Sequence, residues 1–306
     1  MNDGKMFSIH VPASTANLGP GFDSIGLALN LYLSVDVYES EHYQVIPMTE
    51  DLEEFPRDDQ NYIFLVAKKI SSKFGKTLPA CTLKVSNEIP LTRGLGSSAS
   101  AIVAGVELAD VLCGLGLTKE EKAHLASDME GHPDNAGASV LGGLVVGVQL
   151  NEETNLMALP LDGVDIVALI PKYELLTTHS RAVLPSVFSY DEGVKASAIA
   201  NTFLAALLTK NYTLAGKMMS EDRFHQPYRR MLVPHLGVAE KVALEAGAFG
   251  VALSGAGPTI VAFCGIGEAD AVFHALQAQF PEDRVMKLQV DHDGSVTIPI
   301  AKIIKS

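Results

Sequence analysis

The stretch Pro90-Leu91-Thr92-Arg93-Gly94-Leu95-Gly96-Ser97-Ser98-Ala99-Ser100-Ala101 places two glycines and a serine pair where a helical pattern begins. Residues 81–85 before it alternate apolar and polar side chains as a strand does, and residues 101–112 carry apolar side chains at helical spacing. Glycines let a ligand approach the backbone, and the first N–H groups of a helix have no acceptor within the helix. The sequence therefore predicts a strand, a glycine loop and a helix whose N-terminus binds an anion such as phosphate.

This loop differs from two other phosphate-binding motifs. Residues 94–99 fit the loose G-x-G-x-x-G/A fingerprint of dinucleotide-binding folds, but a second helical pattern at 119–129 follows where that fold needs a strand. Gly75-Lys76-Thr77 resembles the end of a P-loop, but Ile70 stands where the P-loop requires glycine. A plain turn that lets a helix pack on a sheet stays open as the alternative.

Length and composition indicate a globular protein. With 306 residues, 47% hydrophobic and 19% charged, the chain can bury a sizeable core, and we expect two domains. The 23 basic and 36 acidic residues give a net charge of −13, which opposes binding to nucleic acid or to an anionic membrane. A small phosphate ligand is compatible with this charge because backbone amides can bind it locally.

Cysteine usage and the chain's apolar segments indicate a soluble, cytoplasmic protein. Cys81, Cys113 and Cys264 are far apart, lie in apolar surroundings and form no C-x-x-C pair, so we expect buried, reduced thiols and no zinc site. The N-terminus has no apolar signal-peptide core. The longest uncharged stretch, residues 246–267, contains a glycine-rich break that would interrupt a membrane helix.

The rest of the chain predicts strands and helices in an α+β order, without internal repeats. A polar loop at 151–155 is expected near the boundary between two domains, 1–160 and 161–306. Strands are expected at 7–11, 34–38, 43–46, within 140–148, at 164–170, on both sides of a turn within 250–263, and at 285–290; helices are expected at 63–74, 193–208, 212–221, 233–246 and 269–280.

Three further short segments combine turn residues with chemically active side chains. Residues 12–24 contain Gly19-Pro20-Gly21, which predicts a tight exposed turn between Asn17 and Asp23. Residues 253–260 join two apolar runs through Ser254-Gly255-Ala256-Gly257-Pro258, as a hairpin turn would. Residues 130–135, Glu130-Gly131-His132-Pro133-Asp134-Asn135, carry hydrogen-bonding and metal-capable groups, and their plainer interpretation is a helix end followed by a polar loop.

Together, the loop at 90–99, the segment 12–23 and the loop at 254–258 resemble motifs of the GHMP small-molecule kinase family, and the resemblance covers nearly the whole chain. It implies a two-domain α+β fold, with an N-terminal domain like ribosomal protein S5 domain 2 and a ferredoxin-like C-terminal domain. ATP and substrate would lie in the cleft between them. Residues 12–23, 132–135 and 226–229 are most similar to members that phosphorylate L-homoserine, which implies an ATP-dependent step of threonine biosynthesis.

The resemblance also implies roles for single residues. ATP would be bound by residues 91–101, by Asn61 near the adenine, and by the loop that contains Gly255 and Gly257. Ser98 and Glu130 would hold Mg²⁺, a cation that prefers hard oxygen ligands. The amino acid would be surrounded by six side chains: Asn17, Asp23, His132, Thr177, Arg181 and Arg229.

This set of side chains suits the two charges of an α-amino acid. Asp23 is the expected counter-ion of the ammonium, and arginines bind a carboxylate through paired, charge-assisted hydrogen bonds. For Arg181 a solvated surface position stays open as the alternative. Arg230 competes with Arg229, and the choice of Arg229 follows the family motif alone.

One departure from the wider family concerns the general base. Relatives that phosphorylate sugars or mevalonate carry an aspartate where this chain places Asn135, and an amide cannot accept the proton. Phosphoryl transfer depends mainly on positioning and charge neutralisation, so the resemblance implies direct attack by the hydroxyl, with Asn17, Asn135, Ser98 and Glu130 as the catalytic set. The neighbouring Asp134 stays open as a base.

Several other functions remain alternatives. They are a GHMP kinase for another small alcohol, such as mevalonate, a sugar or shikimate; a nicotinamide-dependent oxidoreductase; and a non-catalytic binding protein. Arg181 and Arg229 with Asp23 favour an amino acid over a sugar or an isoprenoid. A homodimer is compatible with the sequence, which does not decide the oligomeric state.

Overall fold

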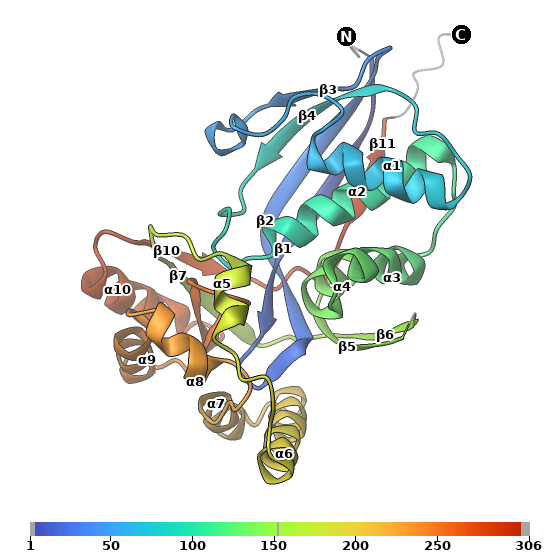
Figure 1. Cartoon of the computed structure of the whole chain (residues 1–306). Helices are drawn as coiled ribbons and strands as arrows, with labels where there is room; N and C mark the ends of the chain where they lie inside the picture. Colours follow the sequence, from blue (N-terminus) through green and yellow to red (C-terminus); the bar gives the residue numbers. More distant parts are fainter. Residues whose placement is uncertain (1–3, 152, 301–306) are drawn as a thin grey trace.

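The computed structural model describes residues 4–151 and 153–300, which build two β-sheets with helices packed around them (Figure 1). The first is a 7-stranded sheet in the order β11-β1-β2-β4-β3, with β5 paired to β2 and β6 paired to β5; the second is a 4-stranded sheet in the order β10-β7-β9-β8. The strands are β1 (Lys5–Asn17), β2 (Gly21–Glu39), β3 (Gln44–Pro47), β4 (Cys81–Asn87), β5 (Leu144–Leu150), β6 (Glu153–Leu159), β7 (Val164–Ile170), β8 (Gly250–Leu253), β9 (Ile260–Gly265), β10 (Arg284–Leu288) and β11 (Val296–Pro299).

The N-terminal helices are stacked on the first sheet (Figure 1). From Leu29 onward β2 alternates buried and partly exposed side chains, so the sheet buries one face fully. Helices α2 and α4 pack on β1 and β2, and α1 and α3 pack against α2 and α4 respectively. These helices are α1 (Tyr62–Lys73), α2 (Ser97–Cys113), α3 (Lys119–Glu130) and α4 (Pro133–Leu141).

The second sheet contributes to two cores. Alternate residues of β7 point to opposite faces: Val167 and Leu169 pack with helices α9 and α10, whereas Ile166 and Ala168 join the large core of the first sheet. The two halves of the chain therefore share one core. The C-terminal helices are α5 (Thr177–Ala182), α6 (Tyr190–Leu208), α7 (Tyr212–Ser220), α8 (Gln226–Arg229), α9 (Leu236–Glu245) and α10 (Ala269–Gln279).

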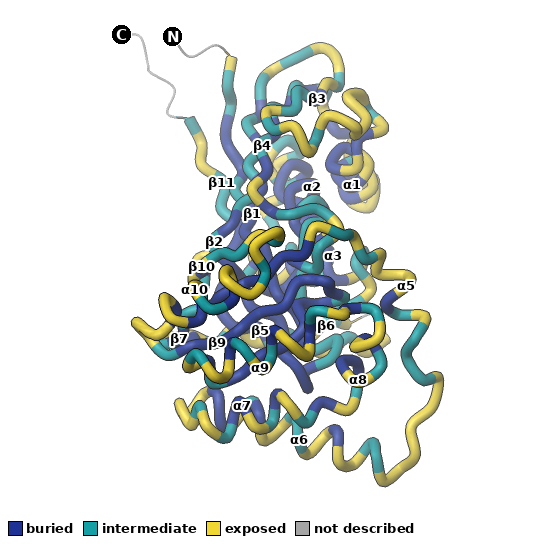
Figure 2. The backbone as a smooth tube through the Cα atoms, turned by 90° about the vertical axis from the view of Figure 1, so that its left-hand side faces the viewer, coloured by how far each residue is buried: buried dark blue, intermediate teal, exposed yellow. Residues whose placement is uncertain are grey.

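Burial is greatest in the strands and lower in the peripheral helices and loops. Figure 2 shows buried residues concentrated in the strands, while α6 and the segment that leads into it are largely exposed. No helix in the described part of the chain is both long and apolar enough to cross a membrane. Cys81 and Cys264 are buried free thiols as predicted, but Cys113 is only half-buried, because it lies in the last turn of α2.

The predicted α+β class and most of the predicted elements are confirmed, and five short elements were missed. The plainer interpretation of residues 130–135 was a helix end followed by a polar loop, but Pro133 begins α4, a position where proline's missing N–H costs nothing. The expected loop at 151–155 runs into β6, an edge strand whose side chains are mostly exposed. Helices α5 and α8 are too short for a periodic pattern, and β11 is a four-residue strand.

The turn at 18–20 is buried, although the sequence predicted an exposed one. Gly19 adopts φ +88°, and a Cβ there would lie 3.1 Å from the backbone oxygen of Met219 in α7. A helix from the second half of the chain thus covers the turn. This contact places the β1–β2 turn at the interface between the two halves.

A boundary between domains near residue 160 is a proposal that the change of sheet between β6 and β7 supports. Strand β11 pairs with β1, so the chain returns to the first sheet after β10.

Replacing Gly216 by alanine should lower the free energy of unfolding by about 1 to 3 kcal/mol through overpacking. Its Cβ would lie 1.6 Å from the backbone oxygen of Phe249, where α7 crosses the start of β8. The matched control is Gly193→Ala in α6, where nothing lies within 4 Å of the new Cβ. That change should be neutral or add up to about 1 kcal/mol through helix propensity. Urea unfolding of both variants measures this, and equal effects would contradict the packing of α7 on β8.

Candidate active site

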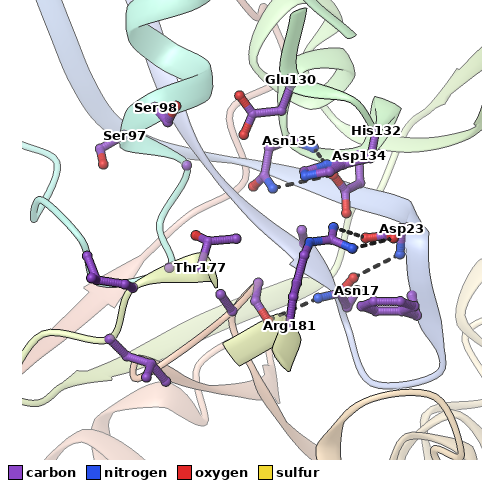
Figure 3. Close-up of a pocket in the computed structure, with 18 of the residues that line it drawn as sticks. Asn17, Asp23, Ser97, Ser98, Glu130, His132, Asp134, Asn135, Thr177 and Arg181 are labelled. Carbon is purple, nitrogen blue, oxygen red and sulfur yellow. Dashed lines mark hydrogen bonds and ion pairs between the residues drawn. The ribbon is translucent and has the colours of Figure 1, made fainter. Parts of the chain in front are cut away.

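A cavity of about 190 Å³ opens where the two halves of the chain meet (Figure 3). Four segments supply its walls: the β1–β2 turn, the glycine loop before α2, residues 130–135, and parts of the second half. Twelve of the lining residues carry the chemistry discussed below: Asn17, Phe22, Asp23, Ser97, Ser98, Glu130, His132, Asp134, Asn135, Thr177, Arg181 and Arg229.

The glycine loop presents a helix N-terminus to this cavity, as the sequence predicted. Helix α2 begins at Ser97 after Gly96, which has φ +73°, and no side chain caps its first N–H groups. Ser97 and Ser98, the first two residues of this helix, line the cavity. The N-terminus of a 17-residue helix therefore faces open space, an arrangement that favours an anion.

The two loop glycines also allow close packing within the protein, which the sequence did not predict. A Cβ on Gly96 would lie 2.2 Å from Ser14 Oγ, and one on Gly94 would lie 2.3 Å from the backbone oxygen of Ser254. Protein atoms occupy the space that a side chain would need at both positions. The glycines thus allow the loop to pack closely against β1 and against the loop at 254–258.

The remaining residues of the predicted ATP loop face in several directions. Thr92 and Gly94 also line the cavity, whereas Leu95 and Ala99 are fully buried beneath it. Arg93 points away, since its guanidinium donates to the carbonyls of residues 171 and 172. Leu91 and Ala101 line a second cavity, Ser100 is buried, and of the predicted glycines at 255 and 257 only Gly255 lines the first cavity.

The second cavity, of about 300 Å³, is mostly apolar and meets the first at Ser97 and Ser98. Asn61 lines it, but both ends of its amide are engaged: Nδ2 donates to the carbonyl of Pro56 at 2.8 Å and Oδ1 accepts the N–H of Ile63 at 3.1 Å. Asn61 therefore caps α1 and shapes the wall. An apolar slot beside a helix N-terminus suits a planar base attached to phosphates.

Ser98 and Glu130 face the same space from α2 and from the end of α3 (Figure 3). Burial raises the pKa of Glu130, while the charge of His132 and the hydroxyl of Ser98 act in the opposite direction. Among the described residues Glu130 forms no ion pair, so no protein cation contacts its carboxyl group directly. A carboxylate and a hydroxyl, both hard oxygen donors, fit a divalent cation such as Mg²⁺.

His132, Asp134 and Asn135 are joined by hydrogen bonds at the start of α4. Asp134 is buried, and its Oδ1 accepts from His132 Nδ1 at 2.6 Å and from the N–H of Asn135 at 2.7 Å. Burial alone would lower the pKa of His132, but the hydrogen bond to Asp134 and nearby carboxylates raise it above its usual value. Asn135 Oδ1 accepts from Ser14 Oγ at 3.0 Å.

Asp23 and Arg181 form a two-point ion pair across the cavity. Arg181 donates from Nη2 to Oδ1 at 2.7 Å and from Nη1 to Oδ2 at 3.0 Å (Figure 3). Asn17 supports Asp23, because its Oδ1 accepts the N–H of Asp23 and its Nδ2 donates to the carbonyl of Gly255, each at 3.0 Å. Arg181 is thus held at the cavity by Asp23, although its side chain stays partly exposed.

Arg229 is a buried cation without a carboxylate in contact with it. It is 1% exposed, and it donates to the carbonyls of Ser180 and Gly255 and to His225. It forms no ion pair within residues 4–151 and 153–300, and burial, with the charge of Arg181, lowers its pKa to about 10. Arg230 instead pairs with Glu240 on the surface at 2.8 Å. Of these two neighbouring arginines, Arg229 lines the cavity and Arg230 does not.

Phe22 was missed by the sequence reasoning. Its ring centroid lies 5.5 Å from the guanidinium carbon of Arg181 and 5.3 Å from that of Arg229. Cations over an aromatic face are stabilised, so Phe22 helps to hold two like charges in one cavity. Its position directly before Asp23 was the available signal.

Comparisons with known proteins show the family of this chain. Residues 61–143 match the GHMP kinases N terminal domain model, and residues 203–282 match the GHMP kinases C terminal model. The chain is 49% identical over 297 residues to homoserine kinase of Bacillus velezensis, covering 97% of this chain and 96% of the relative. It is 48% identical to homoserine kinase of Bacillus licheniformis, with 95% of both chains covered.

Solved structures show the same fold. The crystal structure of homoserine kinase from Cytophaga hutchinsonii superposes with a TM-score of 0.84 at 25% identity, covering 96% of this chain and 98% of that one. Methanococcus jannaschii mevalonate kinase gives a TM-score of 0.71 at 17% identity, covering 94% and 99%. The chain therefore belongs to the GHMP kinase family. Within that family it groups with the homoserine kinases, which it matches over nearly its whole length.

Proposed function

We propose that the protein transfers the γ-phosphate of ATP to the side-chain hydroxyl of L-homoserine, forming O-phospho-L-homoserine in threonine biosynthesis. The observation that carries the choice of substrate is the buried guanidinium of Arg229, which lines the cavity without a carboxylate partner. A carboxylate ligand would supply that partner through charge-assisted hydrogen bonds. The relatives named homoserine kinase support the same assignment.

The ion pair between Asp23 and Arg181 explains how a zwitterion could enter without leaving a charge unpaired. In the structure the two groups neutralise each other. An amino acid brings an ammonium for Asp23 and a carboxylate for Arg181 and Arg229, so each protein charge exchanges one partner for another. A neutral sugar would have to break the pair without replacing it, which is unfavourable.

The nucleotide would occupy the two joined cavities, with its base in the apolar one and its phosphates at the N-terminus of α2. Ser98 and Glu130 would hold Mg²⁺, which when bound neutralises charge on the phosphate oxygens. The free N–H groups of α2 and the Ser97 hydroxyl would orient the phosphates toward the amino acid. Thr177 faces the space between these two regions (Figure 3).

No dedicated base is assigned in this proposal. The position that carries an aspartate in other members is Asn135, whose amide cannot take a proton. The neighbouring Asp134 already accepts hydrogen bonds from His132 and from the backbone of Asn135. We propose that the hydroxyl attacks the γ-phosphorus directly while the bond to the leaving ADP breaks, and that its proton passes late to an oxygen of the transferred phosphate. Asn17 and Asn135 would shape the reaction centre.

Replacing His132 by glutamine should lower kcat by less than about tenfold, because His132 would orient the substrate rather than remove a proton. A general base would contribute about 100- to 10,000-fold. Steady-state kinetics of His132→Gln at saturating ATP and homoserine distinguish the two roles. A loss beyond about a hundredfold would assign the proton transfer to the pair of His132 and Asp134.

The proposed function is tested by incubating the purified protein with ATP and Mg²⁺ and one acceptor at a time: L-homoserine, mevalonate, galactose or shikimate. ADP formation is measured, and the product is identified by ³¹P NMR. We expect ADP and a phosphate monoester with homoserine only. Turnover of another acceptor at a higher specificity constant would assign the protein to a different GHMP kinase activity.

A further inference from the structure

His225 lies fully buried beside Arg229, outside the set of residues that line the cavity. Its Nε2 lies 2.9 Å from the carbonyl oxygen of Gly19, and its Nδ1 lies 3.1 Å from Nη1 of Arg229. A carbonyl can only accept a hydrogen bond and a guanidinium can only donate one. The ring must therefore be neutral, with its proton on Nε2 and an acceptor at Nδ1.

The surroundings hold this ring in one orientation. The carboxylate of Asp222 accepts the N–H groups of Phe224 and Gln226, each at 2.7 Å, and that of His225 at 3.2 Å, which fixes the backbone before α8. Phe22 stacks on the ring with centroids 5.5 Å apart. Asp222 and Arg229 are the charged groups that face His225; Asp222 Oδ2 is 3.5 Å from Nε2, farther than the Gly19 oxygen.

The two contacts of His225 join opposite sides of the substrate site. Gly19 belongs to the turn that leads into Asp23, and Arg229 ends α8 in the second half of the chain. Nη1 of Arg229 contacts His225 Nδ1 and also donates to the carbonyl of Gly255. Nε of Arg229 donates to the carbonyl of Ser180, which leaves Nη2 for a ligand in the cavity. The His225 side chain thus connects the turn that leads into Asp23 with Arg229.

We propose that His225 is a positioning residue that fixes the guanidinium of Arg229 relative to the turn carrying Asp23, and so sets the spacing between the groups that read the carboxylate and the ammonium. The proposal rests on the proposed function, since it assigns that spacing to an amino-acid substrate. It concerns recognition, so it affects the KM for the amino acid and leaves the transfer step nearly unchanged.

Two substitutions separate the two contacts. Asparagine can place an acceptor near the position of Nδ1 and so retain the contact with Arg229. Glutamine can place a donor near Nε2 and retain only the contact with Gly19. The matched control is His235→Gln, because His235 is half-buried and contacts Asp283 at 3.2 Å, away from the cavity.

The specificity constants of each variant are measured for L-homoserine and for 3-aminopropan-1-ol, which lacks the carboxylate. Loss of a hydrogen bond to a charged group should raise the KM of His225→Gln for homoserine by about 10- to 100-fold, with the preference for homoserine falling by the same factor. Its kcat and its KM for ATP should stay near wild type. His225→Asn should retain most of the preference, and His235→Gln all of it.

Equal losses for both acceptors in His225→Gln would overturn the proposal and indicate a merely structural role. A wild-type preference in that variant would overturn it too. Failure of the wild-type protein to phosphorylate homoserine would instead reject the proposed function, so the two failures are distinguishable.

A measurement on the wild-type protein avoids any folding defect of the variants. In ¹⁵N-histidine-labelled protein, NMR should show His225 with a proton on Nε2 and a bare Nδ1 throughout about pH 5.5 to 8.5, unlike an ordinary histidine that titrates in this range. A proton on Nδ1, or titration within the range, would overturn the proposal.

Discussion

Replacing Arg229 by alanine is expected to raise the KM for homoserine by about 30- to several thousand-fold, since leaving a buried carboxylate unpaired costs about 2 to 5 kcal/mol. Arg229 is 1% exposed, and no carboxylate of the described residues pairs with it. The KM for ATP should hardly change, because Arg229 lies outside the glycine loop. Arg181→Ala should have a smaller effect, because Arg181 is half-exposed. Steady-state kinetics in both substrates measure these effects.

The neighbouring arginine is a matched control. Arg230 is exposed and paired with Glu240, so Arg230→Ala should leave both KM values unchanged. Arg229→Lys should rescue poorly, because an ammonium cannot reproduce the planar paired contacts of a guanidinium. Equal losses in the two alanine variants would contradict the assignment of Arg229.

Replacing Glu130 by glutamine should reduce kcat by at least about a hundredfold and at the same time stabilise the ligand-free protein at neutral pH. Turnover falls because an amide is a weaker ligand than a carboxylate for the proposed Mg²⁺. Stability rises because burial disfavours the ionised carboxylate in the folded protein and raises its pKa. Kinetics at saturating Mg²⁺ and ATP measure the first effect, and thermal unfolding without ligands measures the second.

The sign of the stability effect depends on pH. With a raised pKa, the folded protein binds more protons than the unfolded chain between the unfolded pKa of about 4.3 and the folded value. The contribution of Glu130 to the free energy of unfolding therefore falls as pH rises through that window. The glutamine at this position in the variant does not titrate, so its contribution does not depend on pH. The advantage of Glu130→Gln should be present at neutral pH and vanish below about pH 4.

A control for Glu130→Gln lies on the same helix. Asp128 is exposed in α3, so Asp128→Asn should leave kcat unchanged. Near-normal turnover of Glu130→Gln would remove Glu130 from the metal site.

The helix N-terminus at the proposed phosphate site was predictable because its signals are local. Free N–H groups at the start of a helix follow from the glycines, the serines and the helical pattern after them, and α2 begins at Ser97 as expected. The reason for Gly94 and Gly96 was not predictable, since it lies in their packing against Ser14 and Ser254. Such contacts join residues far apart in the sequence.

The residues of the proposed substrate site could not be selected without the fold. Neither composition nor spacing separates Arg229 from Arg230; only their burial does, because α8 turns one guanidinium inward and leaves the other beside Glu240. The pairing of Asp23 with Arg181, 158 positions apart, and the bridge made by His225 likewise require both halves of the chain to be in place. Helix α4 was missed because Gly131 and Pro133 mark the end of one helix and the start of the next within three residues.

The central claim is that the cavity recognises both the ammonium and the carboxylate of an amino acid that carries a hydroxyl. It is tested most directly by the wild-type specificity constants for L-homoserine, for 3-aminopropan-1-ol without the carboxylate, and for 4-hydroxybutanoate without the ammonium. We predict that homoserine is preferred over 3-aminopropan-1-ol by at least about 30-fold, the factor expected for losing the partner of a buried charge such as Arg229. The preference over 4-hydroxybutanoate should be smaller, because the Asp23 side chain is partly exposed. Similar constants for all three acceptors would show that neither Asp23 nor the two arginines recognises the substrate.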